Sequence, residues 1–273
     1  MRVAIVGVGK VGRGLQHALR KARIPCSIVA ARTYVESPRR LRGDVVIIAA
    51  RDGAIARVVE TIVASRKIDR GAIVVHCAGA LDAEVLAPLR SVCAGVAQMH
   101  PMISFADPAR PPSIVGGHAH VAGDALAERR ARRLCRAIGM VPRTFAELDR
   151  VAYHAAAGLV ANGAAALAAA GAELLTRAGA APDQVAAMLG PLLRSVAENV
   201  VVIGLPGALT GPVRRGDAAA VSKHLATLRE KSPELVRLYV EMSGAQLPMA
   251  RALGDASARE FDAIAASLAA SRT

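Results

Sequence analysis

The stretch RVAIVGVGKVG at residues 2–12 decides the fold of this 273-residue chain. It begins with an apolar run from Arg2 to Val6, continues with glycines at positions 7, 9 and 12, and is followed by apolar residues at helical spacing. A GxGxxG pattern alone occurs by chance, but here a strand precedes it and a helix follows it, as in a dinucleotide-binding βα unit. The alternative is a glycine turn in another kind of α/β protein.

Each glycine of this turn has a separate physical role. Gly7 permits the tight turn, Gly9 lets the backbone approach a pyrophosphate, and Gly12 lets the helix pack on the strand. The unpaired N–H groups and the positive dipole at the start of the helix favour an anion. We therefore predict that a cofactor binds the six residues of the turn, which are Gly7, Val8, Gly9, Lys10, Val11 and Gly12.

The composition is that of a globular protein with an aliphatic core. Hydrophobic residues make up 53% of the chain, whereas aromatic residues make up 2%. On the criterion of about 18 consecutive apolar residues without charge, we predict no membrane-spanning helix and no membrane partner. The early glycine turn also predicts that there is no signal peptide. The four cysteines have no metal-like spacing, so we predict no metal and interpret them as reduced core residues of a cytoplasmic protein.

The net charge of +13 is concentrated in the N-terminal half of the chain. Residues 1–150 contain 24 Lys and Arg against 12 Asp and Glu, whereas residues 151–273 contain 11 against 10. The excess therefore accompanies the glycine turn, where it would attract an anionic cofactor or substrate. Nucleic acid is the competing partner. The basic residues are scattered and no aromatic residues alternate with them, so we expect no nucleic-acid binding.

Two kinds of pattern divide the chain near residue 147. Before it, apolar runs alternate with helical patterns, which predicts a Rossmann domain over residues 1–147 with a doubly wound, mostly parallel sheet. The segment 32–43 is too short for a full helix and strand, which indicates a reduced βαβ unit. Residues 148–273 have an Ala-rich helical pattern, and we expect an all-α domain that binds substrate and forms a homodimer. The expected strands lie near residues 2–6, 26–31, 44–50, 71–77, 95–99, 114–115, 119–122 and 140–143, and Asp124 is expected to cap a basic helix that ends near Ile138.

The residues after the second expected strand favour NADP over NAD. An NAD-binding protein usually has Asp or Glu about 20 residues after the glycine turn, where it binds the ribose hydroxyls. This chain has Arg32 followed by Thr33, and an arginine with a hydroxyl suits a 2′-phosphate. Arg39 and Arg40 are close enough in sequence to help. The alternative is that Arg32 is a solvated residue of an Arg-rich chain.

Ligands of doubly wound sheets lie beyond the carboxyl ends of the strands, and three such ends carry candidate residues. Ala50 and Arg51 should pass beside the cofactor, and the backbone of His76 and Ala78 could contact the nicotinamide ribose. His100 is placed to approach the reactive end of the nicotinamide, as a candidate catalytic residue. The alternative role of His100 is to fix a turn before the proline that follows it.

The first long helix of the second domain carries the other candidate catalytic residues. His154, Gly158 and Asn162 are four residues apart, so two polar residues share a broad helix face with a small residue between them. Asn162 would hold a substrate carbonyl or carboxylate, and His154 would donate a proton to the atom that becomes negative on hydride addition. Alternatively, His154 caps the helix and Asn162 bonds to a neighbouring helix.

A loop rich in glycine and proline at residues 209–217 supplies candidate substrate ligands. Thr210 and Arg215 offer donors, and Arg215 could hold a substrate carboxylate with two parallel hydrogen bonds. Asp217 is expected to cap the following helix. The alternative is that Arg215 and Asp217 pair across the turn.

Six ordered segments of the chain resemble those of one protein family. They are GVGKVG at 7–12, AARDGAI at 49–55, HCAGAL at 76–81, HPMISFADP at 100–108, YHAAAGLVAN at 153–162 and LTGPVRRGD at 209–217. The set is similar to that of Rossmann-like proteins with the C-terminal domain of unknown function 2520. That family resembles deazaflavin-dependent NADP oxidoreductases, 6-phosphogluconate and β-hydroxyacid dehydrogenases, and ketopantoate and pyrroline-carboxylate reductases. The resemblance implies an NADP oxidoreductase whose helical domain is like the C-terminal domain of 6-phosphogluconate dehydrogenase.

Two positions depart from the pattern of these relatives. The related dehydrogenases have a lysine four residues before the helix asparagine, where this chain has Gly158, and His154 is the nearest candidate for its task. The family tends to have serine where this chain has Ala78. We therefore expect an NADPH-dependent reductase of a small 2-oxo acid, ketopantoate-like, or of a cyclic imine acid, with hydride transfer in a cleft between domains. The alternative is a non-catalytic NADP-binding sensor or interaction protein that kept the fold.

Overall fold

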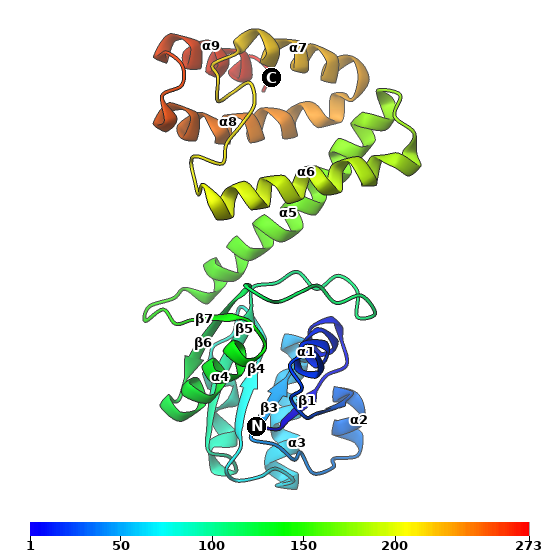
Figure 1. Ribbon diagram of the computed structural model, residues 1–273, viewed down its shortest axis with the longest axis vertical. Helices are drawn as coiled ribbons and strands as arrows, with labels where there is room; N and C mark the ends of the chain where they lie inside the picture. Colours follow the sequence, from blue (N-terminus) through cyan, green and yellow to red (C-terminus); the bar gives the residue numbers. More distant parts are fainter. Residues whose placement is uncertain (273) are drawn as a thin grey trace. The chain divides into compact units, whose positions relative to one another are not determined.

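The N-terminal part of the protein is built on a seven-stranded sheet (Figure 1). The strands of this computed structural model, which describes residues 1–272, are β1 (Val3–Val6), β2 (Cys26–Val29), β3 (Val45–Ile48), β4 (Ile73–His76), β5 (Gly95–Pro101), β6 (His118–Gly123) and β7 (Val141–Arg143). Their order is β2-β1-β3-β4-β5-β6-β7. The first five pair in parallel, and β6 runs antiparallel to β5. The predicted α/β fold with a mostly parallel sheet is confirmed.

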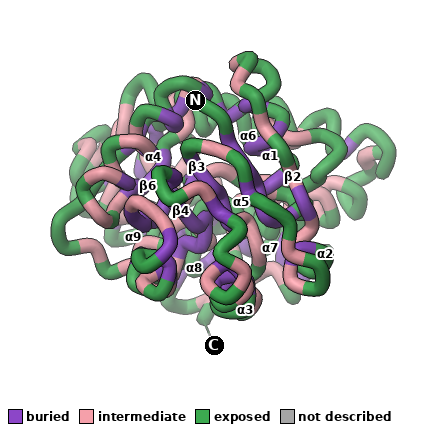
Figure 2. The backbone as a smooth tube through the Cα atoms, turned by 90° about the horizontal axis from the view of Figure 1, so that it is seen from below, coloured by how far each residue is buried: buried purple, intermediate pink, exposed green. Residues whose placement is uncertain are grey.

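Helices cover both faces of this sheet, as Figure 1 shows. α1 (Lys10–Lys21) and α4 (Ala125–Ala137) pack on one face. α2 (Ala31–Glu36), α3 (Asp52–Ser65) and the 3₁₀ helix η1 (Ala83–Ser91) pack on the other. In β1, β3 and β4 every residue is buried, and Figure 2 shows buried segments along β3 and β4. Cover on both faces explains why these strands are unbroken apolar runs.

The connection between β2 and β3 is shorter than an ordinary βαβ crossover. α2 has six residues, and an irregular segment then leads to β3. Within residues 1–272 no strand pairs with the outer side of β2, which therefore forms one edge of the sheet. The predicted reduction of this unit is confirmed.

Two local predictions are wrong. Residues 114–115 form no strand and belong to a loop. Asp124 occupies the N-cap position of α4, but its side chain does not cap the helix. Its carboxylate instead accepts from the guanidinium of Arg90 (2.9 Å) and from the backbone N–H of Val96 (2.9 Å). Asp124 thus joins α4 to η1 and β5.

The chain divides into two compact units, residues 1–161 and 162–273, and the division falls inside α5 (Arg150–Arg177). The second unit is helical, as predicted. Val240, Phe261 and Ile264 are buried at the centre of its core. Beyond α5 its elements are α6 (Pro182–Val202), α7 (Ala218–Lys231), the 3₁₀ turn η2 (Pro233–Leu235), α8 (Val236–Leu253) and α9 (Ala258–Ala269).

The helices α5 and α6 expose most of their apolar residues. None of the residues of α5 is buried, and α6 buries only Val185. By length and composition alone, both helices could cross a membrane. Residues 151–172 contain no charged side chain. The chain therefore does contain an uncharged stretch of more than 18 residues, and the expectation that it has none is wrong. Buried core helices of soluble proteins pass the same test, but the most apolar windows of α5 and α6 are only 0% and 6% buried.

Candidate active site

A pocket of about 520 Å³ lies beyond the carboxyl ends of β1, β3, β4 and β5, within the first unit. A doubly wound sheet binds its ligand at this edge. The pocket brings together residues of the glycine turn, the loops after β3 and β4, and the two histidines predicted to be catalytic. Its lining consists of Gly9, Lys10, Val11, Ala49, Ala50, Arg51, Asp52, Cys77, Ala78, Gly79, His100 and His154.

The glycine turn has the backbone geometry of a pyrophosphate cradle. Gly7 has a φ of +129°, and a Cβ there would collide with the backbone oxygen of Ala49. A Cβ on Gly12 would collide with the backbone oxygen of Gly7, so α1 packs directly on the turn. Gly9 faces open space, Val8 is exposed beside it, and no side chain caps α1. The N–H groups at the start of α1 are therefore free for an anionic ligand.

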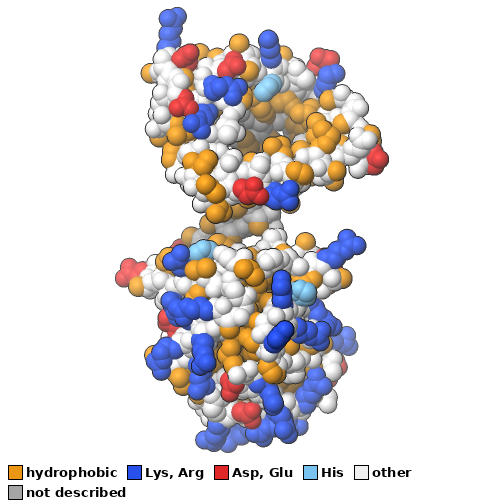
Figure 3. Space-filling model, viewed as in Figure 1, with side chains coloured by type: hydrophobic (Ala, Val, Ile, Leu, Met, Phe, Trp, Pro, Cys, Tyr) orange, Lys and Arg blue, Asp and Glu red, His pale blue; other side chains and the backbone are white. Residues whose placement is uncertain are grey.

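The charge around the pocket is positive. Among its lining residues, Lys10 and Arg51 are basic and Asp52 is acidic. Figure 3 shows Lys and Arg side chains over much of the visible face of the first unit. This distribution agrees with the basic excess of the N-terminal half, and it favours an anionic cofactor.

Arg32 borders a separate groove between α2 and α3. Its exposed side chain donates from Nε to Glu36 (2.8 Å), one helical turn further along α2. Arg57 of α3, which sequence reasoning missed, lines the same groove, whereas Thr33 is exposed and does not. Two guanidinium groups beside one groove suit a phosphate group. The remaining lining residues are Ala31, Val35, Glu36, Ala54 and Val58, so the groove has two basic side chains and one acidic side chain.

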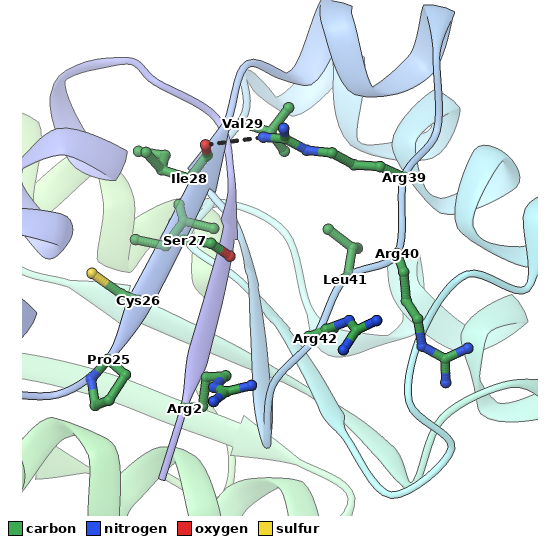
Figure 4. A pocket seen from close by; sticks show the side chains of 11 residues that line it. Arg2, Pro25, Cys26, Ser27, Ile28, Val29, Arg39, Arg40, Leu41 and Arg42 are labelled. Atoms are coloured by element: carbon green, nitrogen blue, oxygen red, sulfur yellow. Dashed lines mark hydrogen bonds between the residues drawn. The ribbon is translucent and has the colours of Figure 1, made fainter.

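Arg39 and Arg40 do not line the groove of Arg32. They belong to a groove along the edge strand β2, where Figure 4 shows Arg39 reaching toward Ile28. Nη2 of Arg39 donates to the backbone oxygen of Ile28 (3.3 Å), and Arg40 pairs with Asp69, four residues before β4 (2.8 Å). The expectation that these two arginines assist Arg32 is wrong, because they line a different groove.

His76 organises the loop after β4. Its buried ring places Nε2 2.7 Å from the backbone oxygen of Asp82, to which it donates, and Nδ1 accepts from the N–H of Ala78 (3.2 Å). One ring nitrogen donates and the other accepts, as in a neutral imidazole. Burial lowers the pKa of His76, which also favours the neutral form. The pocket lining begins at the next residue, Cys77. The structure thus places the side chain of His76 behind the pocket, where it supports the loop, and a contact of its backbone with a cofactor stays a prediction.

Gln98 fixes the same loop from the neighbouring strand. Its buried Nε2 donates to the backbone oxygens of Ala78 (2.7 Å) and Gly79 (3.3 Å). These acceptors set the orientation of the amide, so that Oε1 accepts from Nδ1 of His120 (3.0 Å) and from Nε of Arg150 (3.2 Å). His120 therefore carries its proton on Nδ1, and the first residue of α5 is tied to the sheet.

His100 and His154 meet at Gly79. Their ring centroids are 5.8 Å apart. A Cβ on Gly79 would collide with Nδ1 of His154 and would lie 2.9 Å from Nε2 of His100, so both nitrogens face this glycine. Nδ1 of His100 is 3.2 Å from the hydroxyl of Tyr153. Burial, followed by repulsion from the neighbouring histidines, lowers the pKa of His100 to about 4, so its ring is neutral at neutral pH.

His154 is not the cap of its helix. The carboxylate of Asp149 accepts from the backbone N–H groups of Val151 (2.9 Å) and Ala152 (3.0 Å), and thereby caps α5. His154 lies one turn further on, with an exposed side chain that lines the pocket. Its imidazole is therefore free to face a ligand.

The other predicted residues belong to the second unit. Asn162 is exposed on α5, and Thr210 and Arg215 are exposed in the loop before α7. Asp217 caps α7 by accepting from the N–H of Ala220 (2.9 Å), as predicted. The roles of Asn162, Thr210 and Arg215 toward a substrate stay predictions.

Arg214 holds this loop together. It pairs with Asp255 (2.6 Å) and donates to the backbone oxygen of Leu209 (2.7 Å). The neighbouring Arg215 is left with its side chain exposed.

Two domain families match the chain. Residues 22–101 match the model of the Rossmann-like domain, and residues 118–246 match that of the domain of unknown function 2520. Both domains occur in the expected order, which confirms the family resemblance. No curated protein matches the chain.

Several solved structures share the fold. A candidate NADP oxidoreductase from Bacteroides fragilis is 20% identical over 90% of this chain and 98% of its own, with a TM-score of 0.69. A Thermotoga maritima protein is 22% identical over 92% of this chain and 98% of its own, with a TM-score of 0.67. Pyrroline carboxylate reductase from Plasmodium falciparum, solved with NADP bound, is 14% identical over 93% of this chain and 98% of its own, with a TM-score of 0.59.

Proposed function

We propose that this chain, in which a Rossmann-like domain precedes the domain of unknown function 2520, is an NADPH-dependent reductase of a small carbonyl acid. One observation carries the proposal: a single pocket of the first unit contains both the open glycine turn and the pair His100 and His154. A dinucleotide-binding turn alone would suit many functions. Two imidazoles at the same pocket add groups that can donate hydrogen bonds and protons to a reacting substrate.

The residues of the first unit fit a phosphorylated dinucleotide. The open side of Gly9 and the uncapped start of α1 would receive the pyrophosphate, next to Lys10 and Arg51. Arg32 and Arg57 would bind a 2′-phosphate, which favours NADP over NAD. Fold relatives include proteins solved with NADP or NADPH and one described as NADH-preferring, so the choice of NADP rests on the two arginines. When bound, the cofactor supplies the hydride, and the protein positions the substrate and protonates it.

The two histidines have different surroundings and therefore different tasks. His100 is half-buried and neutral, so it donates a hydrogen bond without giving up a proton. His154 is exposed to the pocket and would give a proton to the oxygen that becomes negative when the carbonyl carbon is reduced. Asn162, Thr210 and Arg215 are the candidates to hold the substrate carboxylate. A ketopantoate-like 2-oxo acid is the leading substrate, and a cyclic imine acid such as a pyrroline carboxylate is the next.

Cofactor preference is tested by replacing Arg32 with glutamate and measuring the affinity for NADPH and NADH. The change removes the guanidinium that balances Glu36 and adds a second carboxylate, which repels a 2′-phosphate, so NADPH binding should weaken at least tenfold while NADH binding changes little. Arg259→Glu, an exposed change of the same charge on α9, is the control. Equal losses for the two cofactors would contradict the assignment.

Turnover is tested by following NADPH oxidation with a panel of 2-oxo acids and cyclic imine acids. At least one should be reduced, and His154→Ala and Asn162→Ala should each lower turnover about a hundredfold, within the usual range for loss of a positioned catalytic group. Tight NADPH binding without turnover of any acid, together with a conformational change between the oxidised and reduced cofactor, would instead favour a sensor.

We also infer that the protein forms a homodimer through its helical part. The end of α6 exposes Val201 and Val202 by 84% and 81%, and Ile203 and Leu205 follow with 61% and 69%. Contiguous exposed aliphatic residues of this size are usually covered by a partner. A second copy of the chain is the partner that is always present, and closed two-fold symmetry is the commonest arrangement.

A further inference from the structure

Two alternate residues of β5 hold the first turn of α5. Gln98 and His100 are two residues apart, so their side chains leave the same face of the strand. Gln98 accepts from Arg150, and His100 contacts the hydroxyl of Tyr153, three residues further along α5 (3.2 Å). The ring of Tyr153 also lies 5.7 Å from the ring of His120. Tyr153 therefore has a fixed place behind His100, although it does not line the pocket.

The hydroxyl proton of Tyr153 decides which nitrogen of His100 carries a proton. Within residues 1–272, His100 is the only group that hydrogen-bonds to this hydroxyl. Burial raises the pKa of Tyr153, so the hydroxyl keeps its proton and needs an acceptor for it. Nδ1 of His100 is that acceptor, which leaves the proton of the neutral ring on Nε2. The opposite arrangement would leave the tyrosine proton without a protein acceptor among the described residues.

This tautomer presents an N–H group to the pocket. Nε2 of His100 faces Gly79, beside Nδ1 of His154. A neutral ring protonated on Nε2 can only donate at that atom. A carbonyl oxygen accepts such a hydrogen bond. The nitrogen of a protonated cyclic imine carries its own N–H. It would face the N–H of His100, so two donors would oppose each other and no hydrogen bond could form between them.

We propose that Tyr153 is a positioning residue that makes His100 a fixed hydrogen-bond donor, so that the site selects 2-oxo acids over protonated cyclic imine acids. The proposal rests on the proposed reductase function and names its substrate class. Tyr153 acts through His100 and touches neither substrate nor cofactor. Loss of one donor–acceptor match is expected to change the preference between the two substrates at least tenfold.

Nitrogen NMR of the histidine side chains tests the tautomer without any reaction. In the wild-type protein, His100 should be protonated on Nε2 and unprotonated on Nδ1. Its signals are assigned by their loss in His100→Gln. Tyr153→Phe should convert His100 to a mixture of tautomers. Tyr239→Phe is the matched control, because Tyr239 makes an equivalent pair with His224 in the second unit (2.9 Å) and should leave His100 unchanged. A proton on Nδ1 of wild-type His100 would overturn the proposal.

Kinetics tests the selection itself. The ratio of kcat/KM for a 2-oxo acid to that for a pyrroline carboxylate should fall about twofold in Tyr153→Phe, because an even mixture of tautomers leaves half of the His100 rings with a donor at Nε2, and it should not change in Tyr239→Phe. An unchanged ratio in Tyr153→Phe, or a wild-type preference for the imine acid, would overturn the proposal. If the wild-type protein reduces neither acid, the reductase function fails, whereas the NMR result still decides the tautomer.

Discussion

Acid should destabilise the first unit through His100, by an amount that follows from its surroundings. In the unfolded chain this ring has the ordinary pKa of 6.5, whereas burial lowers the pKa of His100 in the folded protein to about 4. Above pH 6.5 the ring is neutral in both states. Between pH 6.5 and pH 4 the unfolded chain binds a proton that the folded protein does not, so the free energy of unfolding falls as the pH falls. At about 1.4 kcal/mol per pKa unit, the full loss is about 3 kcal/mol, of which about 2 kcal/mol is reached at pH 5.

Urea unfolding at pH 7 and pH 5, followed by circular dichroism, measures this loss in the wild-type protein and in His100→Gln. His76 and His120, whose pKa values are also lowered by burial, are present in both proteins, so the difference between the two isolates His100. The variant should lose about 2 kcal/mol less than the wild type between the two pH values. Equal losses would refute the reasoning that His100 is held neutral by its burial.

Two further perturbations address the pocket and the assembly. Gly79→Ala should lower turnover at least tenfold, because a methyl group there would collide with Nδ1 of His154. The control is Gly53→Ala, where a Cβ would meet open space, and it should have little effect on turnover. Similar losses of turnover in both variants would contradict a role for the close approach of His154 to Gly79. Light scattering should show a dimer for the wild-type chain and a monomer after Val201→Lys with Val202→Lys, since two buried charges without partners would oppose association. A wild-type monomer, or a dimer that survives both lysines, would show that this end of α6 is not the interface.

The parts of the fold that depend on local pattern could be predicted from the sequence. The apolar run before Gly7 and the helical spacing in Asp52–Ser65 are local, and β1 and α3 form over these residues. Prediction failed where a distant partner competes. Asp124 is a good capping residue by type, but the guanidinium of Arg90, 34 residues away in sequence, binds its carboxylate. Nothing in the neighbourhood of Asp124 reveals that partner.

The same distinction applies to the candidate site. In a parallel sheet the carboxyl ends of the strands lie at one edge. The presence of Ala50, Ala78 and His100 at one pocket could therefore be expected. The contacts of Gln98 with Arg150 and of His100 with Tyr153 join residues more than 50 positions apart, and no local pattern predicts them. One signal was present: two polar residues at alternate positions of the otherwise apolar strand β5 share one face and need partners there.

If the proposed function is right, the pocket of the first unit binds NADPH and a carbonyl acid is reduced beside His100 and His154. In a single-turnover experiment, the protein is mixed with an equal amount of NADPH and an excess of each 2-oxo acid, and NADPH absorbance is followed. NADPH should be consumed with at least one acid, and His154→Ala should bind NADPH normally but consume it about a hundredfold more slowly. Failure of the wild-type protein to bind NADPH, or consumption at the same rate in His154→Ala, would contradict the proposed function.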